Sequence, residues 1–143
     1  MMKQIPYGLT DFGRIQKENY YYVDKTMFIE KIEMQPSYLF LIRPRRFGKS
    51  LTLAMLEAYY DVRYADQFDE LSGNLYIGQH PTPIHNQVLI MRFNFSEVSS
   101  NINEVEESFR LHCCGKLRHF LQKYEHILGK EIHQMLLIKH QYK

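Results

Sequence analysis

The sequence lacks most features that mark secreted, membrane-spanning or disulfide-stabilised proteins. Its 143 residues contain two cysteines, Cys113 and Cys114, and adjacent cysteines rarely bridge each other because their Cβ atoms point apart. This argues against a disulfide scaffold and favours a reducing compartment. The first residues contain no apolar core of a signal peptide, and no apolar run approaches the roughly 20 residues of a membrane span. We therefore expect a cytoplasmic protein that does not cross a membrane.

An excess of charge of either sign is also missing. The 18 basic and 16 acidic side chains leave a net charge of +2, which gives no general case for binding nucleic acid or a membrane. Repeats and low-complexity linkers are not found either. The apolar fraction of 45% is enough for a hydrophobic core, and the length suits one domain.

The clearest chemical signal lies between residues 38 and 60. An unbroken apolar run at 38–42 is typical of a strand covered on both faces in a parallel sheet. A basic turn follows, and Gly48-Lys49-Ser50 opens a helix that we expect to extend to about residue 60. This order of strand, loop and helix is the context that a phosphate-binding loop of the form G-x-x-x-x-G-K-[ST] requires.

Each residue of the tripeptide has a physical reason to be there. Gly48 lets the backbone approach a phosphate without a Cβ clash. The first N–H groups of the following helix have no intrahelical partners, and the helix dipole favours an anion there. Lys49 would place its charge on the β- and γ-phosphates, and the Ser50 hydroxyl would hold Mg²⁺. No catalytic residue is assigned.

The loop departs from the full pattern at its entrance. Arg43 stands where the pattern has glycine, and Pro44 fixes φ and removes one N–H donor. Two basic side chains further along the loop could compensate with positive charge near the phosphates. Two interpretations stay open, a solvated basic turn or a nucleotide loop. The nucleotide loop would comprise Arg45, Arg46, Phe47, Gly48, Lys49, Ser50 and Leu51.

Other segments complete the expected fold. Residues 87–95 are rich in Val, Leu, Ile and Phe and predict a second strand. Between 102 and 128, apolar residues recur at the helical period and predict a helix. Thr26 is a candidate N-cap for a helix that Pro36 ends. Helices and strands therefore alternate as αβαβα, which favours an α/β fold with a parallel sheet.

Several motifs resemble those of the bacterial AAA-ATPase-like family. The loop at 43–51 matches in its form Arg-Pro-Arg-Arg-Phe-Gly-Lys-Ser-Leu, and so does Tyr-Tyr-Tyr-Val-Asp-Lys-Thr at 20–26. The opening Ile-Pro-Tyr-Gly at 5–8, the Asp-Phe pair at 11–12 and the segment 88–96 also match. Together these motifs are specific enough to imply the family's properties for this chain.

The resemblance covers most of residues 1–128 and implies a P-loop NTPase-like fold with three layers, αβα, and parallel strands. It implies that Gly48, Lys49 and Ser50 bind the phosphates of ATP together with Mg²⁺, and that Arg43 is the family's usual form. ATP is favoured over GTP because the base-reading motif Asn-Lys-x-Asp does not occur.

The resemblance also implies parts that this chain does not contain. Family members continue into a second nucleotide-binding strand ending in Asp-Glu and then into a domain similar to PD-(D/E)xK nucleases. Here the strand at 88–95 is followed by Ser96 and Glu97, and Glu97 is a poor substitute. We therefore expect residues 1–143 to be the N-terminal part of such a domain, without hydrolysis by this chain alone. The alternative is a non-catalytic interaction module, or a truncated remnant, that docks a partner chain or the missing half through the helix at 102–128.

Asp24 carries a second hypothesis. It could contact the base or sugar of the nucleotide, or it could simply cap a helix together with Thr26. The tyrosines of 20–22 could stack on a base, although packing over the edge of the sheet is the expected role. Arginines near the loop could contact a nucleic-acid backbone, but they already serve the phosphate loop, so no separate nucleic-acid site is expected.

Histidines recur every seven residues near the C-terminus, which resembles a ladder of metal ligands. Residues seven apart lie about 10 Å apart along a helix, and two such imidazoles cannot share one metal when ligand bonds are about 2 Å. A solvated polar stripe is therefore expected, and Cys113 is expected to be a small buried hydrophobe rather than a zinc ligand. The stripe comprises His112, His119, His126, His133 and His140.

Overall fold

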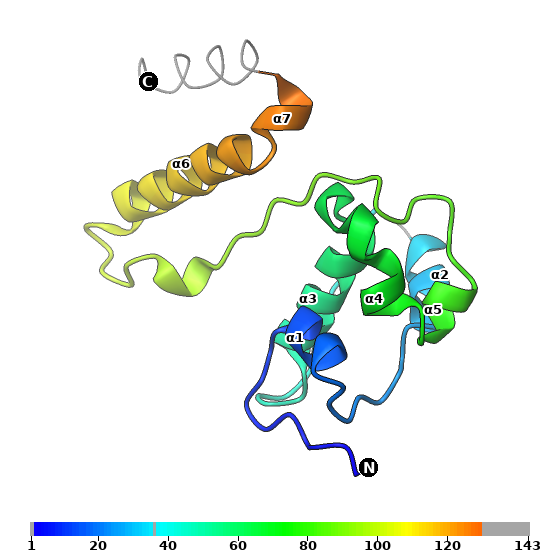
Figure 1. The fold of residues 1–143 in the computed structure, drawn as a ribbon. Helices are drawn as coiled ribbons and strands as arrows, with labels where there is room; N and C mark the ends of the chain where they lie inside the picture. Colours follow the sequence, from blue (N-terminus) through cyan, green and yellow to red (C-terminus); the bar gives the residue numbers. More distant parts are fainter. Residues whose placement is uncertain (1, 36, 130–143) are drawn as a thin grey trace. The chain divides into compact units, whose positions relative to one another are not determined.

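The computed structural model describes residues 2–35 and 37–129, which form helices joined by loops (Figure 1). The chain divides into two units, Met1–Val88 and Leu89–Lys143, and each is described by itself. The first unit contains α1 (Phe12–Lys17), α2 (Phe28–Glu33), α3 (Lys49–Tyr60), η1 (Val62–Gln67), α4 (Phe68–Ser72) and α5 (Tyr76–Gln79). The second contains η2 (Phe95–Glu97), α6 (Val105–Lys123) and α7 (Glu125–Leu128).

The predicted sheet is wrong. Within the described residues neither 38–42 nor 87–95 forms a strand, and the three-layer αβα arrangement with parallel strands is not present. One isolated parallel bridge joins Asp61 to Val88, with the Val62 N–H donating to the Val88 carbonyl at 3.1 Å. A strand needs a neighbour to accept and donate its ladder hydrogen bonds. The apolar side chains of these segments favour burial, but they do not determine which segment would pair with each strand.

The segment 38–42 shows the consequence most clearly. We expected it to be covered on both faces, yet Tyr38 is 87% exposed and Ile42 is 90% exposed. Exposed apolar side chains at adjacent positions in a chain of this size are unusual, because burying each would contribute about 1.5–3 kcal/mol. The segment is therefore an apolar surface of the first unit instead of the centre of its core.

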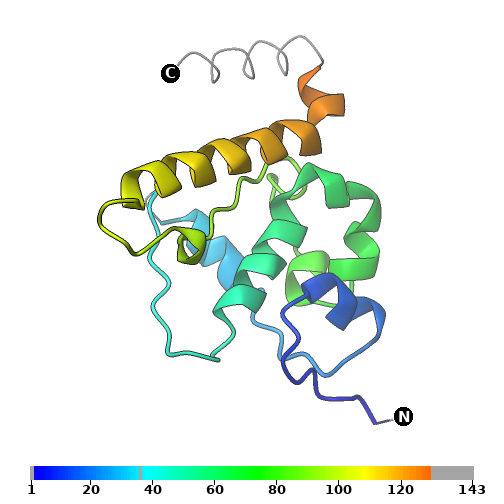
Figure 2. The ribbon, with the colours of Figure 1, turned by 90° about the vertical axis from the view of Figure 1, so that its left-hand side faces the viewer.

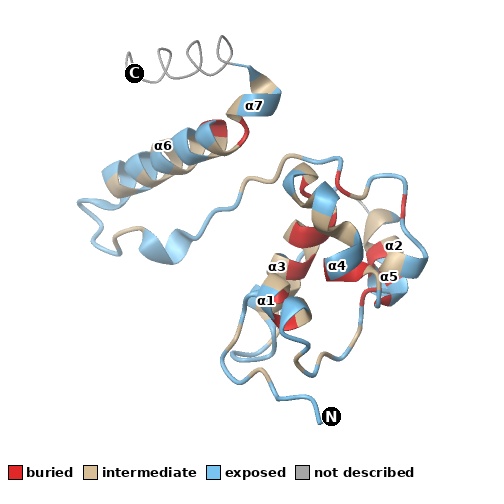
Figure 3. Ribbon diagram, in the orientation of Figure 1, coloured by how far each residue is buried: buried red, intermediate tan, exposed pale blue. Residues whose placement is uncertain are grey.

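Helix α3 lies at the centre of the first unit and has the bounds that the sequence predicted. Its buried face carries Met55, Ala58 and Tyr59, which are spaced i, i+3 and i+4 as one face of a helix requires. These side chains pack with Phe12 of α1 and with Leu71 of α4. Figure 3 shows the buried positions concentrated on the helices around α3. The core thus holds α3, and with it the loop that precedes α3.

The second unit is built on α6. The single helix predicted for 102–128 is interrupted at Tyr124, whose φ of −115° and ψ of 19° end α6 before the short α7 begins. Tyr124 is fully buried, and its hydroxyl accepts a hydrogen bond from the Ile90 N–H at 2.8 Å. Ile102, predicted on the apolar face, lies before α6 and is exposed. No helix in the described residues is both long enough and apolar enough to cross a membrane.

Candidate functional site

The predicted phosphate loop lies between α2 and α3 and leads directly into α3 (Figure 2). Gly48 is the N-cap of α3 and has φ +74° and ψ 17°, a left-handed conformation that glycine adopts at no steric cost. A Cβ at Gly48 would meet nothing within 4 Å. Gly48 is therefore required by the left-handed conformation of the backbone and not by a lack of space for a side chain.

Lys49 folds back across the loop. Its Nζ donates to the Arg43 carbonyl at 2.7 Å and to the Pro44 carbonyl at 2.9 Å. An ammonium group has three donors, so two are engaged by uncharged carbonyl oxygens and the third can reach a further acceptor. Phosphate oxygens are stronger acceptors because they carry charge. The ammonium thus lies within the loop, with one donor left for a further acceptor.

Two further contacts close the loop. The Arg43 Nη1 donates to the Phe47 carbonyl at 3.4 Å, and the Phe47 N–H donates to the Pro44 carbonyl at 3.4 Å. Arg43 stands where the full pattern has glycine. Its side chain reaches across the loop, and its contact with Phe47 supports the turn.

All seven predicted site residues lie in this turn and the first turn of α3. Arg45, Arg46, Phe47 and Ser50 are exposed, and Lys49 is half-buried. Leu51 is half-buried and packs against the core, so it anchors the start of α3. The remaining member is the N-cap glycine described above. The first N–H groups of this 12-residue helix lack intrahelical acceptors, as at the start of any helix.

The polar groups of the loop fit a nucleoside triphosphate with Mg²⁺. The loop offers an ammonium, exposed guanidinium groups and helix N–H groups to phosphate oxygens, and Ser50 offers an exposed hydroxyl to the metal. Mg²⁺ keeps several waters and is usually bound through phosphates with only one or two protein ligands. In the described part of the chain no group of three or more His, Cys, Asp or Glu side chains could hold a metal by itself. A metal at Ser50 would therefore depend on the phosphates.

Sequence reasoning did not find the cavity that adjoins this loop. It has a volume of about 710 Å³, within the roughly 300–1,000 Å³ typical of small-molecule sites. Arg43, Phe47 and Gly48 of the loop line it. Its lining also includes Tyr21, Phe28 and further side chains of α2, α3 and 39–41. The only sequence signal was the aromatic character of the segments 20–28 and 38–47.

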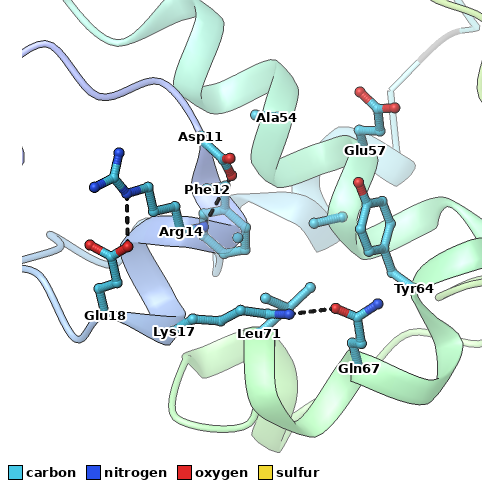
Figure 4. Close-up of a pocket in the computed structure, with 12 residues that line it drawn as sticks. Asp11, Phe12, Arg14, Lys17, Glu18, Ala54, Glu57, Tyr64, Gln67 and Leu71 are labelled. Atoms are coloured by element: carbon cyan, nitrogen blue, oxygen red, sulfur yellow. Dashed lines mark hydrogen bonds and ion pairs between the residues drawn. The ribbon is translucent and has the colours of Figure 1, made fainter.

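A second cavity of about 490 Å³ lies among α1, α3, η1 and α4 (Figure 4). Its charged groups are largely engaged with one another or with neighbouring side chains. The Arg14 Nε donates to the Glu18 Oε1 at 2.8 Å, and the Lys17 Nζ donates to the Gln67 Oε1 at 2.7 Å. The Glu18 carboxylate therefore has its pKa lowered by the Arg14 hydrogen bond. This cavity presents fewer unengaged donors to a ligand than the phosphate loop does.

Asp24 has a structural role in this molecule. Its Oδ1 accepts from the Thr26 N–H at 2.8 Å and from the Thr26 hydroxyl at 2.7 Å, while its Oδ2 accepts from the Tyr76 N–H at 2.7 Å. The Thr26 hydroxyl in turn accepts from the Ile77 N–H at 3.1 Å. These two side chains cap the first N–H groups of α5, so the capping interpretation is favoured over a nucleotide contact. The helix is not the one expected, because α2 has no side-chain cap.

The tyrosines of 20–22 do not cover a sheet edge, since the described residues contain no sheet. The Tyr22 ring packs edge-on against Phe12, with ring centroids 5.5 Å apart. Burial raises the pKa of Tyr22 to about 12, and the charge of Asp24 adds to the shift. Tyr21 is more exposed and faces the cavity beside the loop.

The second unit tests part of the histidine prediction. His119 and His126 are exposed, as a solvated stripe requires, whereas His133 and His140 lie outside the described residues. His112 differs, because its side chain is nearly buried and its Nδ1 lies 3.4 Å from the Glu97 Oε2. Cys113 and Cys114 are both half-buried and free, so Cys113 is less buried than predicted.

Glu97 is engaged by its own neighbours. Its Oε2 lies 3.2 Å from the Lys116 Nζ, and its Oε1 accepts from the Asn94 Nδ2 at 3.2 Å. The hydrogen bond from Lys116 is the main cause of the lowered pKa of Glu97. The expectation that Glu97 is a poor substitute for an acidic Mg²⁺ ligand stays a prediction.

Comparison with known proteins now identifies the family. The chain belongs to the family described as "Predicted AAA-ATPase", whose profile matches residues 6–142. A 55-residue stretch is 49% identical to a protein of Azotobacter chroococcum mcd 1 named "Uncharacterized protein in vnfD 5'region". That stretch is 38% of this chain and 11% of the relative's length, so the two share only a small part of the larger protein. No solved structure matches the chain significantly.

Proposed function

We propose that the turn at 43–51 binds the triphosphate of ATP together with Mg²⁺. The observation that carries this proposal is the position of the Lys49 ammonium, which lies over the loop carbonyls beside the left-handed Gly48 turn. Membership in a family of predicted AAA-ATPases supports ATP as the nucleotide. The loop and its helix form this arrangement without a flanking sheet in the described residues.

The residues of the loop would divide the task. Lys49 would exchange one or both of its carbonyl contacts for oxygens of the outer phosphates, which form stronger charge-assisted bonds. Arg45 and Arg46 are exposed beside it and would add positive charge. The helix N–H groups that follow Gly48 would donate to the phosphate nearest the helix. Ser50 would supply its hydroxyl oxygen to Mg²⁺.

This chain alone would bind the nucleotide without hydrolysing it. Hydrolysis of a bound triphosphate requires an acidic residue for the metal and a group that orients water. Glu97 is the acidic residue nearest to the end of the predicted second strand, and it is paired with Lys116. The turn at 43–51 contains no acidic side chain.

The test is equilibrium binding of labelled ATP, in the presence of Mg²⁺, to the full chain and to Lys49→Ala. Loss of a hydrogen-bonded charge should weaken binding about tenfold or more. Lys3→Ala, which removes an exposed lysine outside the loop, serves as the matched control and should bind as the wild type does. Equal binding by the wild type and Lys49→Ala would contradict the proposal.

A second candidate function follows from the exposed apolar segment 38–42. Tyr38, Phe40 and Ile42 present large apolar side chains to solvent, and surfaces of this kind mark interaction sites. The chain would then act as a non-catalytic interaction module that associates with a second copy through this segment. A stable dimer of the isolated chain without nucleotide, lost in Phe40→Ser, would favour this function, whereas a monomer at high concentration would contradict it.

A further inference from the structure

The cavity beside the phosphate loop is lined by residues of two chemically different kinds. Arg43, Phe47 and Gly48 belong to the loop itself. Most of the remaining wall is apolar and comes from the extended segment before α2, from α2, from 39–41 and from α3. A ligand held at the loop by its phosphates would therefore have an apolar space directly beside its anionic part.

Aromatic rings in this wall are presented to the cavity and not packed into the core. Phe28 is 49% exposed, Tyr21 is 57% exposed and Phe47 is 66% exposed, while core aromatics such as Phe12 are almost completely buried. Helix α2 is anchored by Ile29, the residue after Phe28, whose side chain is fully buried. The exposed rings are therefore not required to fill the core. The Lys31 Nζ lies over the Phe28 ring, 5.3 Å from its centroid, so a planar ligand would stack on the opposite face of Phe28.

We propose that this cavity holds the nucleobase of the triphosphate bound at the loop, through stacking on Tyr21 and Phe28. The inference rests on the proposed function, because the phosphates fix the ligand next to the cavity. Base–aromatic stacking suits any base, since every base presents a π-face. Lys25, which also lines the cavity, can donate to a ring nitrogen or to a ribose oxygen.

The lining of the cavity does not favour discrimination between one nucleobase and another. No Asp, Glu, Asn or Gln side chain lines it in the described part of the chain. Guanine presents two N–H donors on its Watson–Crick edge, which need an acceptor such as a carboxylate. Adenine is read most specifically by a side-chain amide. A cavity without these groups should bind ATP and GTP with affinities within about threefold of each other, because apolar walls discriminate weakly.

The experiment compares three ligands in the presence of Mg²⁺: ATP, GTP and inorganic tripolyphosphate. The proteins are the wild type, Tyr21→Leu, Phe28→Leu and the control Tyr7→Leu, which removes an exposed aromatic that does not line the cavity. Leucine keeps the apolar volume and removes the π-face. Each variant replaces a half-exposed or more exposed side chain, and circular dichroism of each would verify that it folds.

The wild type should bind both nucleotides about fivefold or more tightly than tripolyphosphate, because stacking adds to phosphate binding. Tyr21→Leu and Phe28→Leu should each weaken ATP binding about fivefold or more and leave tripolyphosphate binding unchanged. Tyr7→Leu should match the wild type for all three ligands.

Each contrary result overturns a defined part of the argument. Equal wild-type affinity for ATP and tripolyphosphate would overturn the base site while leaving the phosphate loop intact. Unchanged ATP binding in both cavity variants would do the same, and accompanying loss of self-association would identify the cavity as an interface between copies. Failure of the wild type to bind any of the three ligands would overturn the proposed function together with this inference.

Discussion

Replacing Thr26 by valine should destabilise the first unit more than the same replacement elsewhere. Valine matches threonine in shape, so the change removes a hydroxyl without opening a large cavity. The Thr26 side chain is fully buried, donates to Asp24 at 2.7 Å and accepts from the Ile77 N–H at 3.1 Å. The variant therefore loses a hydrogen bond to a carboxylate and leaves a buried N–H group of α5 without its acceptor.

The magnitude follows from these two losses. A hydrogen bond to a charged group contributes about 1.5–3 kcal/mol, and an unsatisfied buried donor costs about 1–3 kcal/mol. Asp24 keeps its bonds from the Thr26 and Tyr76 N–H groups, and the two losses share one hydroxyl, so they do not simply add. We expect the free energy of unfolding to fall by about 2–4 kcal/mol, a large fraction of the roughly 5–15 kcal/mol typical of a domain.

Thr52→Val supplies the matched control. The Thr52 hydroxyl donates to the Gly48 carbonyl at 3.0 Å, but that carbonyl already accepts from the Thr52 N–H at 2.8 Å. Removing this local bond should change the free energy of unfolding by less than about 0.5 kcal/mol. Urea unfolding followed by circular dichroism measures both variants. Equal stability of the two would refute the assignment of Thr26 as a cap of α5.

Two pH-dependent predictions follow from individual contacts. The pKa of Tyr22 is raised to about 12, so its contribution to stability is complete below the ordinary pKa of 10 and is lost as pH rises toward 12. Burial and the hydrogen bond to Glu33 also raise the pKa of Tyr60, so an ultraviolet titration should show more than one late-ionising tyrosine. Tyr22→Phe should remove one of these late steps, and an unchanged curve would contradict the burial of this ring. In the second unit, Lys116→Met should raise the pKa of Glu97 toward its ordinary value, whereas Lys116→Arg should keep it low. Because the folded pKa of Glu97 is lowered, its contribution to stability is present above the ordinary carboxyl pKa and is lost as pH falls. The pKa of Glu97 can be measured by an NMR titration of its carboxyl group. An equal change of this pKa in both variants would exclude the pairing of Glu97 with Lys116.

The loop and α3 could be predicted from the sequence because their signals are local. The Gly-Lys-Ser tripeptide and the ends of α3 depend on residues within one or two helical turns. The structure places the seven predicted site residues together for the same reason. Nothing in the pattern showed that the Lys49 ammonium would lie on the carbonyls of Arg43 and Pro44, since that depends on the path of the backbone.

The strands and the role of Asp24 could not be predicted in the same way. An apolar run states a preference for burial, whereas a strand also needs a partner that the run itself does not specify. The segment 38–42 has no such partner in the described residues and stays exposed. Asp24 and Thr26 have the composition of a local cap, but the helix they cap begins 52 residues after Asp24. The residue types therefore predicted a helix cap, but their spacing assigned the cap to the nearest helix, α2, instead of to α5.

Position 43 shows how the loop can depart from the full phosphate-loop pattern. Lys49 contacts the carbonyl of Arg43, and a carbonyl is supplied by any residue at this position. The difference between glycine and arginine therefore lies in the conformational freedom of the loop entrance and in the side chain. Here the guanidinium reaches the Phe47 carbonyl and fixes the turn that glycine would leave mobile. A loop held in this way would lose less conformational entropy on binding a phosphate, so the departure is compatible with the proposed phosphate binding.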